Sequence, residues 1–162
     1  MRGTWFLCKL AYQRQEENGK VQNVKEQYLI DAMSFTEAEA RVYEELGSAL
    51  PAFMLTSVAK MNVQEIFPYD DAETWYKAKV QFLDTDERTG KEKKTTHLML
   101  VSAPSVKEAW ERITEKMGGL MATYQITDIN LTQILEIFPY VDDPEKPAFK
   151  EEVDAETGEF VG

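Results

Sequence analysis

The chain has 162 residues, 43% of them hydrophobic, and a formal net charge of −11. This composition supports a hydrophobic core and argues against a mainly disordered chain. No apolar run approaches the roughly 20 residues that a membrane-spanning helix needs. A single cysteine excludes an internal disulfide, and no signal-peptide pattern precedes the first strand pattern. The sequence therefore predicts a reduced, cytoplasmic setting with no membrane partner.

The negative charge is unevenly distributed along the chain. Residues 1–69 carry a net −2, residues 70–74 carry −3, residues 75–140 are balanced, and residues 141–162 carry −6. The part that we expect to fold is therefore nearly neutral. The low overall pI then does not exclude an anionic partner such as nucleic acid.

The chain begins with the pattern of a β-hairpin. Residues 5–12 alternate between apolar and mixed positions, which is typical of a half-buried strand. Asn18-Gly19 follows, and this dipeptide supplies the positive φ angles of a hairpin turn. Residues 22–31 are expected to return as the second strand.

A helix and a final strand follow the hairpin. Ser34 is placed to cap a helix, and Glu37 three residues later completes a capping box. The apolar positions at helical spacing predict the buried stripe Phe35, Ala38, Val42 and Leu46. A long strand over residues 53–66 is expected to end before Pro68, because proline cannot donate a hydrogen bond to a neighbouring strand.

The same elements recur later in the chain. At an offset of 71 residues, sixteen positions between Gly19 and Tyr69 are identical to their mates, and Glu-Ile-Phe-Pro-Tyr ends both copies at 65–69 and 136–140. The final strand of the second copy is expected at 124–137. We therefore predict an α+β fold made by tandem duplication of a β-β-α-β unit, with antiparallel pairing, one helix per repeat and pseudo-two-fold symmetry. The pattern leaves open whether the repeats form one sheet or two, and it does not predict the oligomeric state.

These observations divide the chain into four segments. They are a first repeat at 1–69, an acidic linker at 70–74, a second repeat at 75–140 and an acidic tail at 141–162. A short hairpin is expected in the tail between Phe149 and Phe160. The tail suits a solubility device, an interaction peptide that uses Phe149 and Phe160, or a segment that masks a basic face.

One face of the first strand in each copy carries aromatic and cationic side chains. These are Trp5 and Lys9 in the first copy and Trp75, Lys77 and Lys79 in the second, with Lys91, Lys93 and Lys94 as an extension on the next strand. Aromatic rings among cations on a sheet are typical of surfaces that bind single-stranded nucleic acid, each stacked base contributing roughly 1–3 kcal/mol. The alternative is that both tryptophans pack between the copies or under the acidic tail.

The other chemically notable residues predict no catalytic site. Asp70-Asp71 and Asp142-Asp143 follow the two Phe-Pro-Tyr blocks, where they suit a solvated linker better than a divalent-cation site. Cys8 lies on the apolar face of its strand, and neither it nor His97 has the partners of a metal site or a nucleophile. The sequence therefore predicts no enzyme, cofactor or metal.

Residues 5–140 resemble a DUF4494-like family of small uncharacterised proteins, a domain of unknown function, from Bacteroidales bacteria and their phages and mobile elements. The resemblance rests on the Trp5 start, the Ser34/Glu37 helix cap and the terminal Glu-Ile-Phe-Pro-Tyr. It implies no particular activity, and it favours an accessory protein of a phage or mobile element.

Two functions compete on this basis. The first is a non-enzymatic accessory protein that binds single-stranded nucleic acid. The alternative is an inhibitor that binds or sequesters a host protein or a small nucleotide, with a symmetric nucleotide expected where the copies meet. A metal-dependent enzyme built on the aspartate pairs is the weakest reading.

Overall fold

The computed structural model describes residues 3–140, 155–156 and 158–159. The elements of the first repeat are β1 (Thr4–Gln15), β2 (Val21–Ala32), α1 (Phe35–Leu46), β3 (Phe53–Lys60) and β4 (Glu65–Phe67). Those of the second repeat are β5 (Trp75–Thr85), β6 (Glu92–Ser102), α2 (Val106–Met117), β7 (Thr123–Leu131) and β8 (Ile134–Phe138). A small pair, β9 (Ala155–Glu156) and β10 (Gly158–Glu159), lies in the part of the tail where the sequence predicted a hairpin. The predicted α+β class is confirmed.

Local sequence signals set the turns and helix starts. The hairpins turn at Gly19 and Gly90, whose φ angles are 85° and 72°, a region that glycine enters without steric cost. The Ser34 hydroxyl accepts a hydrogen bond of 3.1 Å from the backbone N–H of Glu37 at the start of α1. Ser105 repeats this arrangement at α2.

The strands of the two repeats form two separate four-stranded sheets, so the repeats do not share one continuous sheet. Their strand orders are β3-β1-β2-β8 and β4-β6-β5-β7. Each sheet thus takes three strands from one repeat and its fourth, short strand from the other repeat. The segment boundaries in the sequence are therefore not the boundaries of the sheets.

The predicted long final strand is wrong in each copy, because the chain leaves its own sheet partway. In the first repeat β3 ends at Lys60, and the Gln64 N–H then donates 2.8 Å to the carbonyl of Leu98 in the other sheet. β4 continues from there beside β6. Within the crossing, the Met61 N–H donates back to the Trp5 carbonyl of the first sheet before the Gln64 N–H pairs with the second, so buried backbone groups exchange one sheet partner for another.

The exchanged strands also change the pairing. β8 runs parallel to β2 and β4 runs parallel to β6, whereas the other pairs of the two large sheets are antiparallel. The prediction of purely antiparallel sheets is corrected at these two edges. A parallel neighbour needs a crossover connection, and here the crossing from one repeat to the other provides it.

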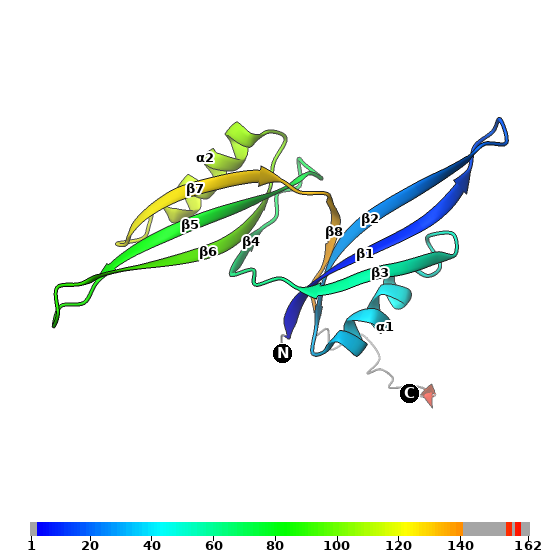
Figure 1. Ribbon diagram of the computed structural model, residues 1–162, viewed down its shortest axis with the longest axis horizontal. Coiled ribbons are helices and arrows are strands. Elements are labelled where there is room, and N and C mark those ends of the chain that lie inside the picture. The colour runs from blue at the N-terminus through cyan, green and yellow to red at the C-terminus, as the bar shows by residue number, and fades with distance from the viewer. Residues whose placement is uncertain (1–2, 141–154, 157, 160–162) are drawn as a thin grey trace.

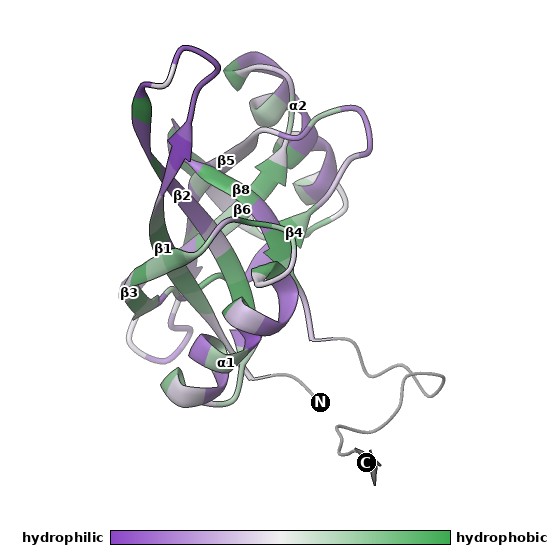
Figure 2. Ribbon diagram, turned by 90° about the vertical axis from the view of Figure 1, so that its right-hand side faces the viewer, coloured by the Kyte–Doolittle hydropathy of each residue, from purple (hydrophilic) through white to green (hydrophobic). Residues whose placement is uncertain are grey.

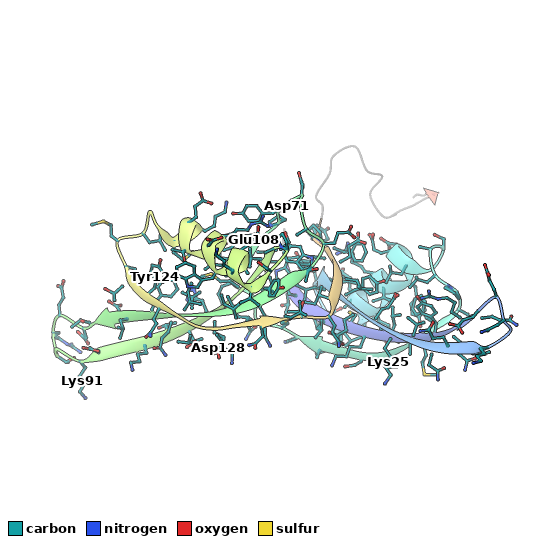
Figure 3. All side chains as sticks on the ribbon, turned by 90° about the horizontal axis from the view of Figure 1, so that it is seen from above. Lys25, Asp71, Lys91, Glu108, Tyr124 and Asp128 are labelled. Atoms are coloured by element: carbon teal, nitrogen blue, oxygen red, sulfur yellow. The ribbon has the colours of Figure 1, made fainter. Side chains whose placement is uncertain are left out.

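One helix packs against one face of each sheet (Figure 1). Both helices lie on the same side of the two sheets, so the opposite side carries no helix (Figure 3). The sheets extend in opposite directions from the middle of the molecule, where the exchanged strands lie. Ala38, Val42 and Leu46 of α1 are buried in the first core. Phe35, predicted at the start of that buried stripe, is instead 51% exposed, as is its mate Val106.

A third apolar cluster joins the two halves. Its buried members are Leu29, Trp75, Leu100 and Ile134, which come from both repeats, and Trp5 and Leu7 pack against it. Figure 2 shows the green, hydrophobic strand segments that meet in this middle region. The burial of apolar side chains from both repeats stabilises the arrangement of one half against the other.

Several residues that are identical in the two repeats make contacts that stabilise the fold. Leu29 and Leu100 meet in the joining cluster. Thr56 and Thr127 lie at matching irregularities of the edge strands, and their hydroxyls donate to the carbonyls of Lys9 and Lys79. Repetition of these residues therefore follows from structure and does not by itself mark a binding site.

Candidate nucleic-acid interface

Trp5 and Trp75 mark the joint between the halves. Trp75 is only 9% exposed and packs in the joining cluster, and Trp5 is half-buried against the same cluster. Their carbonyls also anchor the crossing segments, since the Trp5 carbonyl accepts from the Met61 N–H at 2.9 Å and the Trp75 carbonyl accepts from the Thr132 N–H at 3.0 Å. The prediction that both rings stand free to stack on bases is therefore wrong for Trp75. Packing between the copies, the alternative, is what the structure shows.

Most of the predicted lysines lie on the helix-free face, which consists of the side-chain positions of both sheets that point away from the helices. Side chains alternate between the two faces of a strand. Since Phe6, Cys8 and Leu10 point to the α1 core, Lys9 points away from it. Lys77 and Lys79 likewise alternate with Ala78 and Val80 of the α2 core.

The lysines of β6 divide between the two faces. Lys94 pairs with Leu83, which shares its face with Lys77 and Lys79, so Lys94 belongs to the helix-free face. Lys93 pairs with Asp84 and points to the helix side instead. Lys91 lies in the hairpin turn, where its carbonyl accepts from the Asp86 N–H at 2.8 Å. The predicted basic strip therefore keeps Lys94 and loses Lys93, because adjacent residues of a strand point in opposite directions.

Sequence reasoning missed one lysine of this face. Lys25 on β2 is exposed and pairs with Ala11 of β1. Ala11 is two residues from Lys9 and points to the same face, so Lys25 and Lys9 are diagonal neighbours. Figure 3 shows Lys25, Lys91 and Asp128 on the side of the sheets away from the helices. The hairpin register at Asn18-Gly19 was the signal that would have placed Lys25 beside Lys9.

The helix-free face carries a cationic excess on an acidic protein. Its lysines are Lys9, Lys25, Lys77, Lys79 and Lys94. Its exposed acidic residues are Glu92, opposite Thr85, and Asp128, opposite Lys79. Asp31 lies on the same face but is buried, and its Oδ1 accepts from the Gly3 N–H at 3.0 Å. The exposed side chains of this face therefore carry more positive than negative charge, while the whole chain is at −11.

A family model described as a domain of unknown function, DUF4494, matches residues 4–140. The chain belongs to this family. No curated protein and no solved structure matches it. The match covers both sheets of the described fold, so the DUF4494 domain includes the two repeats and the exchanged strands.

Within the DUF4494 domain, the acidic linker has a structural role at Asp71. Its carboxylate pairs with Arg112 of α2. The hydrogen bond from Arg112 lowers the pKa of the Asp71 carboxyl, while partial desolvation opposes this. The same guanidinium donates 2.7 Å to the carbonyl of Ser102. The described residues contain no group of three or more His, Cys, Asp or Glu side chains placed to hold a metal ion.

The remaining predicted residues either pack in the cores or lie outside the residues that the structure describes. Burial raises the pKa of the Cys8 thiol to about 11. His97 packs edge-on against Phe82, with ring centroids 4.9 Å apart. Asp142, Asp143, Phe149 and Phe160 lie outside the described residues. In the part of the chain that the structure describes, no helix is long and apolar enough to span a membrane.

Proposed function

We propose that this DUF4494 protein is a non-enzymatic, cytoplasmic binding protein that holds single-stranded nucleic acid on its helix-free face. The observation that supports the proposal is the set of five lysines, contributed by both repeats, on one face of an otherwise acidic molecule. The accessory role in a phage or mobile element that the family resemblance implies is part of the same proposal.

The lysines suit a phosphate backbone better than they suit a compact anion. Lys9 and Lys25 lie on one sheet and Lys77, Lys79 and Lys94 on the other, and the two sheets extend away from each other (Figure 1). Charges spread along two sheets match a ligand whose negative charges are also spread along its length. Each phosphate neutralised by a lysine releases condensed counterions, which makes the affinity depend on salt.

Trp5 is the aromatic residue that remains available to this face. It is half-buried beside the joining cluster, at the middle of the molecule. A base that reached this position would stack on part of one ring. We therefore assign most of the binding free energy to contacts between the lysines and the phosphates. The binding mode is therefore expected to be weak in base preference.

A nucleotide site at the joint of the repeats has less support. Apolar side chains occupy that joint, including Leu29, Trp75, Leu100 and Ile134. A nucleotide needs charged or polar partners for its phosphates. A protein partner, the other part of the alternative, is supported by a groove beside α2.

The test is fluorescence anisotropy of a labelled oligothymidine titrated with the full-length protein at two salt concentrations. We expect binding that weakens as salt rises, and a log–log slope that falls by roughly 0.7 for each lysine removed from the helix-free face. Lys25→Ala and Lys79→Ala test that face. Lys107→Ala and Lys116→Ala, which remove the same charge from α2, serve as matched controls. Absence of binding at low salt, or equal effects of all four variants, would refute the proposal.

A further inference from the structure

Equivalent grooves lie between the helix and the outer strand of each sheet. The first, of about 340 Å³, lies between α1 and β3, and the second, of about 380 Å³, lies between α2 and β7. Every residue that lines the second groove is the mate, 71 positions later, of a residue that lines the first. The backbone of the fold thus builds the same groove twice, and only the side chains differ.

The first groove uses its aromatic residue for internal contacts. Phe35 packs edge-on against Phe6, with ring centroids 4.9 Å apart, and the Lys60 ammonium lies 5.8 Å from the Phe35 ring centroid. Glu39 and Thr36 occupy the helix side of this groove. Its exposed surface is therefore partly polar, and its ring already has partners.

The second groove presents an aromatic residue without such partners. Trp110, the mate of Glu39, is 50% exposed and makes no ring or cation contact with other described residues. Lys107, the mate of Thr36, is exposed and forms no salt bridge within the described part of the chain. Val106, Ile126 and Ile129 complete the apolar lining, and Thr127 and Asp128 line the groove on the β7 side. Exposed apolar groups beside an unpaired charge are typical of a binding groove.

The strand beside this groove has an open edge. β7 is the last strand of its sheet, and its other neighbour is β5. The outer backbone N–H and C=O groups of β7 therefore lack a strand partner among the described elements. An extended peptide can add to such an edge, since main-chain hydrogen bonds supply affinity and side-chain pockets supply specificity.

We propose that the groove between α2 and β7 binds an extended segment of a partner protein in which an apolar residue stands two positions from an aspartate or glutamate. In an added strand, residues i and i+2 point to the same face. Lys107 and Trp110 are three residues apart on α2 and therefore adjacent on its surface. The apolar side chain packs on Trp110, and the carboxylate pairs with Lys107. This groove lies on the helix side of the sheet, and it adjoins the lysine face of the proposed function at Asp128.

A second copy of the chain suits the groove less well. Two copies each carry a formal charge of −11, most of it in the linker and the tail, which opposes their approach at low salt. The irregularity of β7 between Ile126 and Asp128 also bends the edge, and such bends disfavour pairing between two full sheets. A single peptide strand adapts to the bend more readily.

The test begins with a displayed library of random nine-residue peptides selected on the full-length protein. We expect enrichment of sequences with an apolar residue two positions from Asp or Glu. For the enriched peptides, Trp110→Ser should weaken binding about tenfold or more. Lys107→Glu should weaken it about fivefold and restore it for peptides that carry lysine in place of the acid. Hydrogen exchange of the β7 amides should slow when a peptide binds.

The mate groove provides the controls. Glu39→Ser and Thr36→Glu change the equivalent positions between α1 and β3 and should leave peptide binding unchanged. Enriched peptides without the pattern, or protection of β3 in place of β7, would overturn the proposal. So would a dimer in light scattering that dissociates in Trp110→Ser, because a second copy would then occupy the groove.

Discussion

The guanidinium of Arg112 lies over the ring of Tyr69, with its central carbon 4.3 Å from the ring centroid. Tyr69 ends the first repeat, whereas Arg112 belongs to the helix of the second. The backbone N–H of Tyr69 also donates 2.6 Å to the Ser102 hydroxyl. The mate of this arginine, Arg41, donates to the carbonyls of Asp31 and Pro139. Equivalent arginines therefore hold the end of each repeat against the other.

Loss of the buried tryptophan should destabilise the whole molecule. Trp75→Ala removes the buried indole ring of the joining cluster, and we expect a cost of about 3–5 kcal/mol in the free energy of unfolding. Urea denaturation measures this cost. Trp110→Ala removes the same ring from a half-exposed position and should cost about 1 kcal/mol or less. Equal losses in the two variants would contradict a packing role for Trp75.

The Asp71–Arg112 pair should make stability depend on acidic pH. The pKa of the Asp71 carboxyl is lowered in the folded state by the hydrogen bond from Arg112. The carboxylate thus stabilises the fold above the ordinary aspartate pKa near 3.9, and this contribution is lost as pH falls through the lowered folded pKa. Asp71→Asn should lower the Tm at neutral pH and converge with the wild type under acidic conditions.

The neighbouring residue provides the control for this experiment. Asp70 is exposed and forms no salt bridge within the described residues, so Asp70→Asn should leave the Tm at neutral pH nearly unchanged. A Tm difference between Asp71→Asn and the wild type that stays constant from pH 7 to the acid limit would show that the pair does not titrate as proposed.

Cys8 should be unreactive in the native protein. Burial raises the pKa of its thiol to about 11, and the thiolate is the reactive form. An aromatic disulfide reagent at pH 8 should label Cys8 only as fast as the protein unfolds, and denaturant should make labelling immediate. Rapid labelling without denaturant would contradict the burial of this side chain.

The raised pKa of the Cys8 thiol in the folded state also makes stability depend on alkaline pH. The contribution of this thiol to the free energy of unfolding is complete below its unfolded pKa and is lost as pH rises toward about 11.

The hairpin glycine should resist substitution. Gly90 has a φ of 72°, where a side chain costs about 1–2 kcal/mol. Gly90→Ala should lower the free energy of unfolding by this amount in a urea titration. Gly119→Ala is the matched control, since a Cβ there meets no atom within 4 Å and its φ is not in the positive range. Equal stability of the two variants would show that the turn does not require glycine.

Local signals in the sequence were sufficient to predict most of the helices and strands and to show that they occur twice. The Asn18-Gly19 turn, the Ser34/Glu37 cap and the alternation of β1 depend on contacts between residues close in the chain, which is why they could be identified without coordinates. The same alternation placed Lys9, Lys77 and Lys79 on the face away from the helices. It would also have separated Lys93 from Lys94 had it been applied to β6.

Only the tertiary structure decided which sheet each final strand joins. The pattern of residues 53–66 is that of one strand, and nothing within it shows that the chain crosses to the other sheet after Lys60. That choice depends on long-range partners, such as the Leu98 carbonyl for Gln64 and the joining cluster for Ile66. The joining cluster buries Trp75, whereas Trp110 on α2 lies outside that cluster and is 50% exposed. By itself the sequence determined which elements form and that they form twice, because those preferences are local. The tertiary structure decided which aromatic residues face solvent, because burial is set by residues distant in the chain.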